Sequence, residues 1–252
     1  MKAAERQLKI RQIFESRDFI DSETLCRELA ASESSVRRDL DILEQAGLLK
    51  RVYGGAIALQ TAPNHSFDYA LESGRMSEEK SRIARLTAGL IEDGQTVILD
   101  GGSTVAAVAR ELAAKSLHIV TNSLPIAESL ESSRDIELTL TGGYFDPRLR
   151  VMLGPVCEQM LGAIHADTVI MGIGGITAQG FSNNNTLVVG SEQKMIAVAS
   201  RVIIVTDRSK FGRDGMFSVA PLTAARTVVS DAALAPEFAA LLRQSGVEVL
   251  LA

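Results

Sequence analysis

The chain has 252 residues, of which 46% are hydrophobic and 23% charged, and its formal net charge is -5. This length accommodates two domains, and the composition is that of a folded globular protein rather than a disordered or fibrous one. No apolar run approaches the ~18 residues of a membrane span, and the charged N-terminal segment does not have the form of a signal peptide. We therefore expect a cytoplasmic protein that does not enter the membrane.

The cysteines and histidines do not indicate a metal centre. Cys26 and Cys157 lie far apart and form no Cys-x-x-Cys pair, so neither a disulfide framework nor a cysteine zinc site is supported. His65, His118 and His165 lack metal-ligand spacing and have no nucleophile beside them. The sequence thus predicts no metal, no cofactor and no catalytic residue.

Three short helices are predicted near the N-terminus. The first contains Ile10 and Phe14, and the second begins at an N-cap, Ser22. The third follows the cap Ser32 and ends before Gly47. Three helices of this length in about sixty residues are typical of a helix-turn-helix module.

The third helix has the pattern of a DNA-recognition helix. Val36, Leu40 and Leu43 recur at the spacing of one buried face. The remaining surface of the helix then carries two short hydroxyl residues, Ser34 and Ser35, and two adjacent arginines, Arg37 and Arg38. In a major groove these side chains could reach base edges and phosphates. The alternative is a solvated charged face with an ion pair between Arg37 and Asp41.

A basic hairpin follows this helix. Apolar and basic residues alternate after Gly47, and Gly54 and Gly55 supply a tight turn, which together predict the wing of a winged helix-turn-helix. Residues 1–60 contain ten Lys or Arg and ten Asp or Glu, so the module is neutral. Arg37, Arg38, Lys50 and Arg51 nevertheless cluster on the third helix and the hairpin, where a local basic face can serve phosphate contacts. The predicted DNA-binding residues are Ser34, Ser35, Arg37, Arg38, Lys50, Arg51 and Tyr53.

The run S-x-x-S-V-R-R-D-L-x-x-L-x-x-x-G-L-L-x-R-x-x-G-G-A closely resembles the N-terminal signature of the DeoR family of bacterial transcriptional regulators. That signature usually reads S-x-x-T-I-R-R-D-L and ends in H-G-G-A. Here Ser35, Val36 and Tyr53 replace the threonine, isoleucine and histidine, and Ala30-Ala31 stands where a Gly-Val turn is common. The last change bears on the angle between the helices and so on operator preference.

The rest of the chain alternates short apolar, β-branched runs with helical patterns. Uninterrupted apolar strands separated by helices predict a parallel sheet covered on both faces, so the fold class is α/β, with a Rossmann-like domain after the winged module. We expect domain boundaries at 1–59 for the winged helix-turn-helix, 60–76 for a linker and 77–252 for the α/β domain. The predicted strands read TVILD, LHIVTN, IELTLTGG, DTVIMGIGG, RVIIVTD, RTVVSD and VEVLLA.

Loops rich in glycine and hydroxyl residues follow the first four of these strands. Ligands of open α/β sheets bind at such strand ends, where glycines admit a ligand to the backbone and helix N-termini attract phosphate. The alternative for any one loop is a tight strand-to-helix turn. No Gly-x-Gly-x-x-Gly follows the first strand and no P-loop sequence occurs, which disfavours a dinucleotide dehydrogenase or a P-loop enzyme.

The second domain also resembles the sensor half of DeoR-family regulators, through EEK-x-x-IA, LDGGST, VTNSLPIA and SKFG among other pieces. That sensor fold is similar to sugar-phosphate isomerases such as ribose-5-phosphate isomerase, and in the family it is taken to bind phosphorylated sugars. Two departures are Ala70, where an arginine is common, and the Asn183-Asn184-Asn185 run. By this resemblance the effector-binding residues are Asp100, Gly102, Ser103, Thr104, Asn122, Gly143 and Lys210.

These patterns predict a DNA-binding transcriptional regulator, a repressor, that is controlled by a phosphorylated sugar and governs a carbohydrate operon. Its partners would be double-stranded operator DNA, the effector and further copies of itself in a dimer or tetramer. The alternative is a sugar-phosphate isomerase-like enzyme with an appended helical domain. That enzyme would need a positioned acid and base, and Asp100, Asp146 and Glu192 form no pattern readable as catalytic. A further alternative is an RNA-binding or protein-interaction module.

Overall fold

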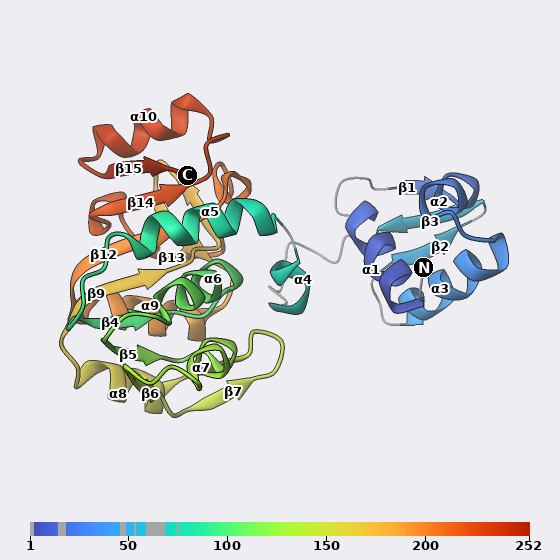
Figure 1. Cartoon of the computed structure of the whole chain (residues 1–252). Helices are drawn as coiled ribbons and strands as arrows, with labels where there is room; N and C mark the ends of the chain where they lie inside the picture. The colour runs from blue at the N-terminus through green and yellow to red at the C-terminus, as the bar shows by residue number, and fades with distance from the viewer. Residues whose placement is uncertain (1–2, 15–18, 46–48, 53, 59–68, 75) are drawn as a thin grey trace. The chain divides into compact units, whose positions relative to one another are not determined.

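A computed structural model describes residues 3–14, 19–45, 49–52, 54–58, 69–74 and 76–252. The chain divides into two compact units, Met1–Asn64 and His65–Ala252, each with its own core (Figure 1). Within the segment 60–76 that the sequence assigns to a linker, the structure shows a short helix, α4 (Tyr69–Ser73). This helix belongs to the second unit, and the N–H of Tyr69 donates to the carbonyl of Arg148 at 3.0 Å.

The first unit combines three helices with a three-stranded antiparallel sheet of order β1-β3-β2 in the part of the chain described. In β2 and β3, Leu49 pairs with Ala58 and Val52 with Gly55, which forms the hairpin predicted as the wing. The elements are α1 (Ala3–Phe14), β1 (Phe19–Asp21), α2 (Ser22–Leu29), α3 (Glu33–Gln45), β2 (Leu49–Val52) and β3 (Gly55–Ala58).

The two ends of the second helix are defined by its caps. The N-cap of α2 is Asp21 rather than the predicted Ser22, because the carboxylate of Asp21 accepts the N–H of Thr24 at 2.7 Å. A carboxylate also interacts favourably with the positive end of the helix. At the other end Ala30 adopts the left-handed conformation with φ 46°, where a glycine would avoid the clash of Cβ.

The second unit is built on a seven-stranded sheet in which every neighbouring pair is parallel. The strand order is β15-β14-β12-β9-β4-β5-β6. All seven predicted strands are present, and the predicted α/β fold class is confirmed. The strands are β4 (Thr96–Leu99), β5 (Leu117–Thr121), β6 (Ile136–Leu140), β9 (Ala166–Met171), β12 (Ala199–Val205), β14 (Thr227–Ser230) and β15 (Glu248–Leu251).

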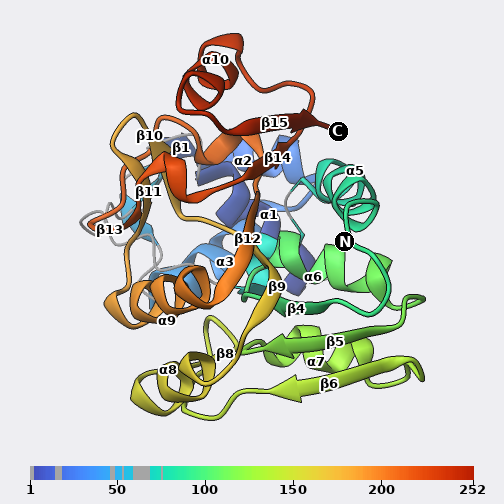
Figure 2. The ribbon, with the colours of Figure 1, turned by 90° about the vertical axis from the view of Figure 1, so that its left-hand side faces the viewer.

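Helices cover both faces of this sheet, as Figure 2 shows. On β4, Ile98 packs into the core on the side of α8 and α9, whereas Val97 and Leu99 pack into the core on the side of α5, α6 and α7. This alternation explains the uninterrupted apolar runs, since each face of the strand is buried. The helices are α5 (Ser77–Ala88), α6 (Ser103–Leu112), α7 (Leu124–Leu130), α8 (Pro155–Gly162), α9 (Thr186–Val198) and α10 (Pro236–Gln244).

Two small antiparallel sheets lie outside the main sheet and were not predicted. One pairs β7 (Tyr144–Asp146) with β8 (Val151–Leu153). The other has the order β10-β11-β13 and consists of β10 (Gly175–Thr177), β11 (Gly180–Asn183) and β13 (Phe217–Ala220). Two short 3-10 helices, η1 (Arg208–Lys210) and η2 (Leu222–Ala224), follow β12 and β13.

Candidate functional site

The two faces of α3 differ as the sequence predicted. Val36, Leu40 and Leu43 are at most 4% exposed and pack in the core of the first unit. Ser34, Arg37 and Arg38 are exposed on the remaining surface, and Ser35 is half-buried. The guanidinium of Arg37 lies 4.0 Å from the Glu33 carboxylate in an exposed pair, which is worth little in water. Arg38 has no ion-pair partner within the described residues, so both arginines are available to a ligand.

Asp39 connects this helix to α1. Its side chain is buried, and its carboxylate accepts hydrogen bonds from Arg6 and, at 2.9 Å, from the amide of Gln7. A buried carboxylate needs such partners to offset its desolvation. The Arg-Arg-Asp-Leu run therefore consists of two exposed arginines followed by two buried residues, and the aspartate attaches the helix that presents the arginines to α1.

The two basic residues of the wing have different surroundings. Lys50 is exposed on β2, whereas Arg51 forms an ion pair with Asp41 of α3. The N–H of Arg51 also donates to the Glu44 carboxylate at 2.8 Å. Arg51 therefore ties the wing to α3, and Asp41 pairs with this arginine instead of Arg37. Tyr53, also predicted to contact DNA, lies outside the described residues.

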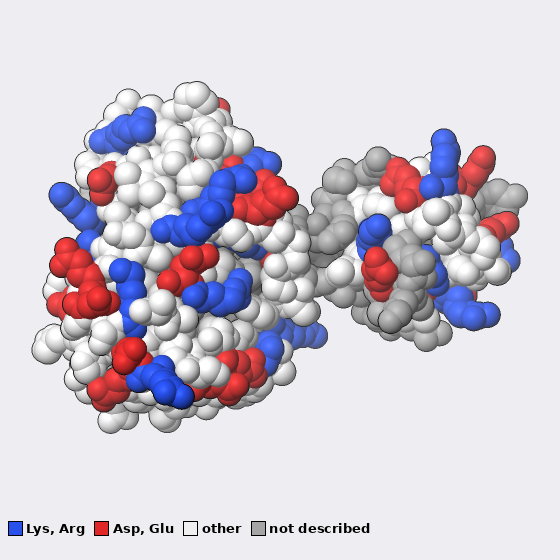
Figure 3. All heavy atoms as spheres, in the orientation of Figure 1, with Lys and Arg blue, Asp and Glu red and all other residues white. Residues whose placement is uncertain are grey.

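On the face of the first unit that Figure 3 shows, acidic and basic side chains are interspersed. A surface with mixed charges binds an anion through the placement of a few cations rather than through a broad electrostatic field.

The loop after β4 holds five residues at the carboxyl edge of the main sheet. The N–H of Asp100 donates to the carbonyl of Ile170, which fixes the loop against β9. A Cβ on Gly101 would lie 2.3 Å from Cγ1 of Val151, so this close approach requires glycine. Gly102 has φ 138° and is the N-cap of α6, with no side chain capping that helix end. Ser103 and Thr104 open the helix at 9% exposure each.

The loops after β5 and β6 lie beside this turn. Asn122 is 1% exposed, and its side-chain oxygen Oδ1 faces Gly101, 3.9 Å from where a Cβ would stand. Asn122 Oδ1 and Ser123 Oγ have no hydrogen-bond partner within the described residues. Gly143 has φ 129°, and a Cβ there would lie 2.5 Å from the carbonyl oxygen of Leu153. Backbone packing therefore requires glycine at position 143, and the contact of Gly143 with the effector stays a prediction.

Two buried carboxyl groups face this region. Burial raises the pKa of Asp100 to about 7, although the N–H of Gly101 and the amide of Asn122 favour its charged form. Burial also raises the pKa of Glu192 on α9, and the charge of Asp100 raises it further. Each carboxyl therefore disfavours ionisation of the other. Neither the β4 loop pattern nor the helix pattern of α9 indicated that the two groups meet.

Lys210 lies in η1 and is engaged by an acidic residue. Its Nζ is 3.2 Å from Oε2 of Glu72 on α4, and both side chains are mostly buried. The preceding Arg208 pairs with Asp231 at 2.8 Å and with Glu79 of α5 at 3.8 Å. Although burial opposes it, the N–H and guanidinium of Arg208 hold the pKa of Asp231 below its usual value. The segment after β12 is thereby attached to both α4 and α5.

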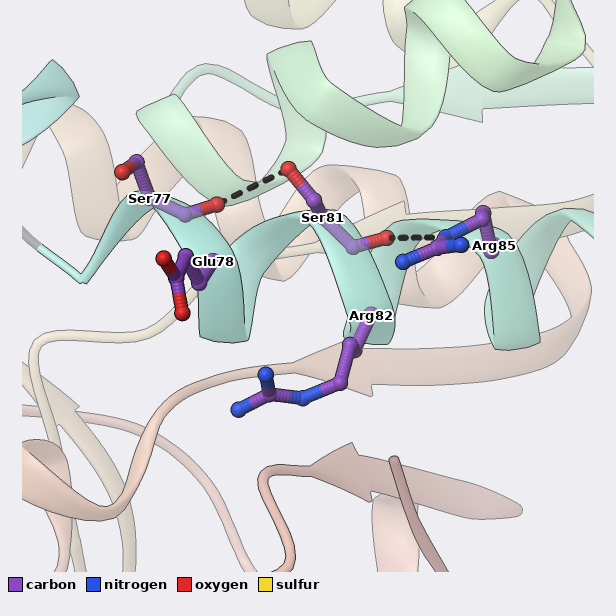
Figure 4. Close-up of a pocket in the computed structure, with 5 residues that line it drawn as sticks. All are labelled: Ser77, Glu78, Ser81, Arg82 and Arg85. Carbon is purple, nitrogen blue, oxygen red and sulfur yellow. Dashed lines mark hydrogen bonds between the residues drawn. The ribbon is translucent and has the colours of Figure 1, made fainter.

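A separate surface hollow lies along α5 (Figure 4). It contains none of the predicted effector residues. Within it Arg85 Nε donates to the carbonyl of Ser81, and Ser81 Oγ donates to the carbonyl of Ser77. The residues that line it are Ser77, Glu78, Ser81, Arg82 and Arg85.

The structure thus gathers Asp100, Gly102, Ser103, Thr104 and Asn122 at one edge of the sheet. Glu192, which accepts a hydrogen bond from Asn183, lies near enough to Asp100 to respond to its charge. Glu192 was not grouped with the predicted effector-binding residues, because it follows the fourth loop by many positions. Among the described residues there is no group of three or more His, Cys, Asp or Glu that could hold a metal ion. None of the described helices has the length and apolar character to span a membrane.

A winged helix-turn-helix followed by an α/β unit with a polar site at its strand ends defines a DNA-binding regulator with a ligand-sensing domain. Residues 6–62 match the DeoR-like helix-turn-helix domain, and residues 75–232 match the DeoR C terminal sensor domain. The chain belongs to the DeoR family of transcriptional regulators. The predicted family and the predicted role as a regulator rather than an enzyme are confirmed.

Curated relatives cover nearly the whole chain. It is 34% identical to the HTH-type transcriptional repressor GlcR of Bacillus subtilis, over 100% of this chain and 97% of that protein. It is 32% identical to the transcriptional repressor AccR of Agrobacterium fabrum, over 90% and 89%. Ribose 5-phosphate isomerase from Plasmodium falciparum superposes with a TM-score of 0.40 at 19% identity, over 56% of this chain and 55% of that one.

Proposed function

We propose that this protein represses transcription by binding operator DNA through α3 and the β2–β3 wing, and that a phosphorylated sugar bound in the second unit controls this binding. The observation that carries the proposal is the division of α3 into a buried face and a face with two available arginines. As an operator-binding protein it would act in the cytoplasm, with the chromosome. The relatives named above are both transcriptional repressors, which supports the direction of control.

On DNA, α3 would enter the major groove while the wing follows the backbone. Arg37 and Arg38 supply cations that can form bidentate hydrogen bonds to a guanine edge or pair with phosphates. Ser34 and Ser35, near the start of the helix, can donate to either. Lys50 on the wing supplies a further exposed cation for a phosphate.

In the second unit, the N-terminus of α6 would hold the phosphate. No side chain caps this helix end, so the N–H groups of Ser103 and Thr104 and their hydroxyls can all be directed to an anion. Lys210 would add a charge-assisted contact once it is released from Glu72. The buried polar atoms at the neighbouring strand ends would then meet the sugar hydroxyls.

Binding of the full-length protein to labelled DNA from its own promoter tests both halves of the proposal. The wild type should bind and should be released by one or more sugar phosphates, with a much smaller effect of the free sugar. Arg37→Ala/Arg38→Ala should lose specific binding while remaining folded, because each lost base contact costs about 1 to 3 kcal/mol and the buried face of α3 is intact.

Thr104→Val is the matched variant for the second unit. It should bind the promoter like the wild type and fail to respond to the sugar phosphate, because the change removes one hydroxyl at the start of α6. A double arginine variant that still protects the promoter would refute the interface. If none of a panel of hexose, pentose and triose phosphates affects promoter binding by the wild type, the proposed class of effector is refuted. Chemical conversion of an active compound would refute a purely regulatory role.

A further inference from the structure

Glu192 brings an unsatisfied oxygen into the effector site. The side chain projects from α9 and is 1% exposed. One oxygen, Oε1, accepts a hydrogen bond from the amide of Asn183 at 2.9 Å. The other, Oε2, has no partner within the part of the chain that the structure describes. A buried oxygen in this condition destabilises the protein unless a ligand or water supplies a donor.

Unsatisfied atoms of the same kind come from the other side of the site. Asn122 Oδ1, at the end of β5, is buried without a partner within the described residues, and it faces the turn at Gly101. Ser123 Oγ is buried without a partner as well. Asp100 lies close enough to Glu192 for its charge to act on that carboxyl. Two separate elements, α9 and the β5 loop, therefore contribute buried polar atoms without a described partner in the neighbourhood of Asp100.

This combination favours hydroxyl groups over other chemical groups. An apolar group would leave these buried polar atoms unpaired. Hydroxyls both donate and accept, so they can pair with each of these atoms, whether or not the carboxyls carry a proton, without bringing charge into the interior. The phosphate must then lie at the opposite end, at the N-terminus of α6, where the backbone N–H groups favour an anion.

The geometry points to Glu192, held by Asn183, as the residue that selects the effector by its hydroxyl groups. This inference rests on the proposed function and narrows it. The effector would be a phosphorylated polyhydroxyl compound with free hydroxyls at the end away from the phosphate. A deoxy compound that lacks these hydroxyls would leave Glu192 Oε2 unsatisfied and would bind weakly.

Calorimetric titration of the full-length protein tests this assignment. The probes are ribose 5-phosphate, glucose 6-phosphate, fructose 6-phosphate and sorbitol 6-phosphate, the 2-deoxy analogues of the first two, and inorganic phosphate. For the sugar phosphate that binds the wild type most tightly, Glu192→Gln should raise Kd about tenfold or more, because it replaces an oxygen that can accept a hydrogen bond with an amide nitrogen that can only donate. The Kd of inorganic phosphate should stay unchanged, because phosphate occupies only the α6 end.

Two controls separate this role from a general structural one. Glu131→Gln makes the same chemical change at an exposed position and should leave every Kd unchanged. Thr104→Val should weaken the binding of inorganic phosphate and of sugar phosphate alike. If Glu192→Gln does not fold, the wild type with a deoxy analogue removes the same hydrogen bonds from the ligand side, and a weaker Kd than that of the parent compound is expected.

The outcomes distinguish this inference from the function on which it rests. Tight sugar phosphate binding that is equal in the wild type and Glu192→Gln, or equal for parent and deoxy compounds, would overturn the assignment of Glu192 alone. Equal losses of inorganic phosphate binding and sugar phosphate binding in Glu192→Gln would also overturn the assignment. A wild type that binds none of the phosphorylated probes would overturn the proposed function and this inference together.

Discussion

Two buried carboxyl groups lie at the edge of the main sheet, where their desolvation costs stability. Asp100 and Glu192 are each nearly inaccessible to solvent, and both carboxyls have a raised pKa, chiefly through burial. Strain or desolvation retained at one place in a fold usually accompanies a function there. The cost to stability can be measured through its pH dependence.

The pKa of Asp100, raised to about 7, predicts how stability changes with pH. Between the usual carboxyl pKa of 3.8 and about 7, the folded protein keeps a proton that the unfolded chain gives up. This group therefore makes folding less favourable as pH rises through that window, by at most about 1.4 kcal/mol per pH unit. The charge of Asp100, where it forms, in turn raises the pKa of Glu192 and of Cys157, in both cases in addition to the larger effect of burial.

Asp100→Asn should remove this pH dependence. Relative to the wild type, the variant should be more stable at pH 7 than at pH 5, as measured by urea unfolding followed by circular dichroism. Comparison with the wild type at each pH cancels the contributions of the carboxylates that do not interact with Asp100. A difference between the two proteins that does not change from pH 5 to pH 7 would show that Asp100 is ionised in the fold.

At the scale of elements, the sequence predicted the strands better than the loops. Successive residues of β4 pack alternately into the cores on the two faces of the sheet, so an uninterrupted apolar run such as TVIL indicates a buried parallel strand directly. The hairpin β7–β8 was not predicted, because strands of three residues contain too little pattern. Glu192 was not predicted to contact the effector because its position depends on how α9 packs, which no local pattern encodes. Arg51 was predicted to contact DNA, but its ion pair with Asp41 arises only when the wing folds onto α3.

The wing therefore makes a testable distinction between its two basic residues. Lys50→Ala should reduce the slope of log K against log salt for operator binding by about 0.9, the value for one neutralised phosphate. Arg51→Met should weaken binding with little change of slope, because it releases the wing from α3 rather than removing a phosphate contact. Salt titrations of operator binding by both variants measure this difference. Equal reductions in slope would mean that Arg51 leaves Asp41 and contacts DNA.

At the scale of the whole molecule, one winged module offers few contacts for tight and specific binding. Four exposed residues on α3 and the wing, namely Ser34, Arg37, Arg38 and Lys50, form the described part of the proposed interface. Specific complexes of this kind commonly gain affinity by placing two modules on repeated half-sites. A chain with one such module achieves this through self-association.

We therefore expect the full-length protein to be at least dimeric at micromolar concentration, with the second unit sufficient for association. Light scattering of the whole chain measures the mass directly, and footprinting should show two half-sites about one helical turn apart or a multiple of it. A monomer both free and bound to DNA, protecting a single half-site, would contradict this expectation.

If Lys210 contacts the phosphate of the effector as proposed above, its ion pair with Glu72 competes with effector binding. A phosphate that takes Lys210 must displace a carboxylate on α4, the first described helix after the DNA-binding unit. The apparent affinity is then lower than that of the bare site, and the deficit is the free energy available to change the attachment of α4. Thermodynamic reciprocity then applies to α4. Anything that holds α4 in place, including operator DNA if it does so, must weaken effector binding by the same factor by which the effector weakens the attachment of α4.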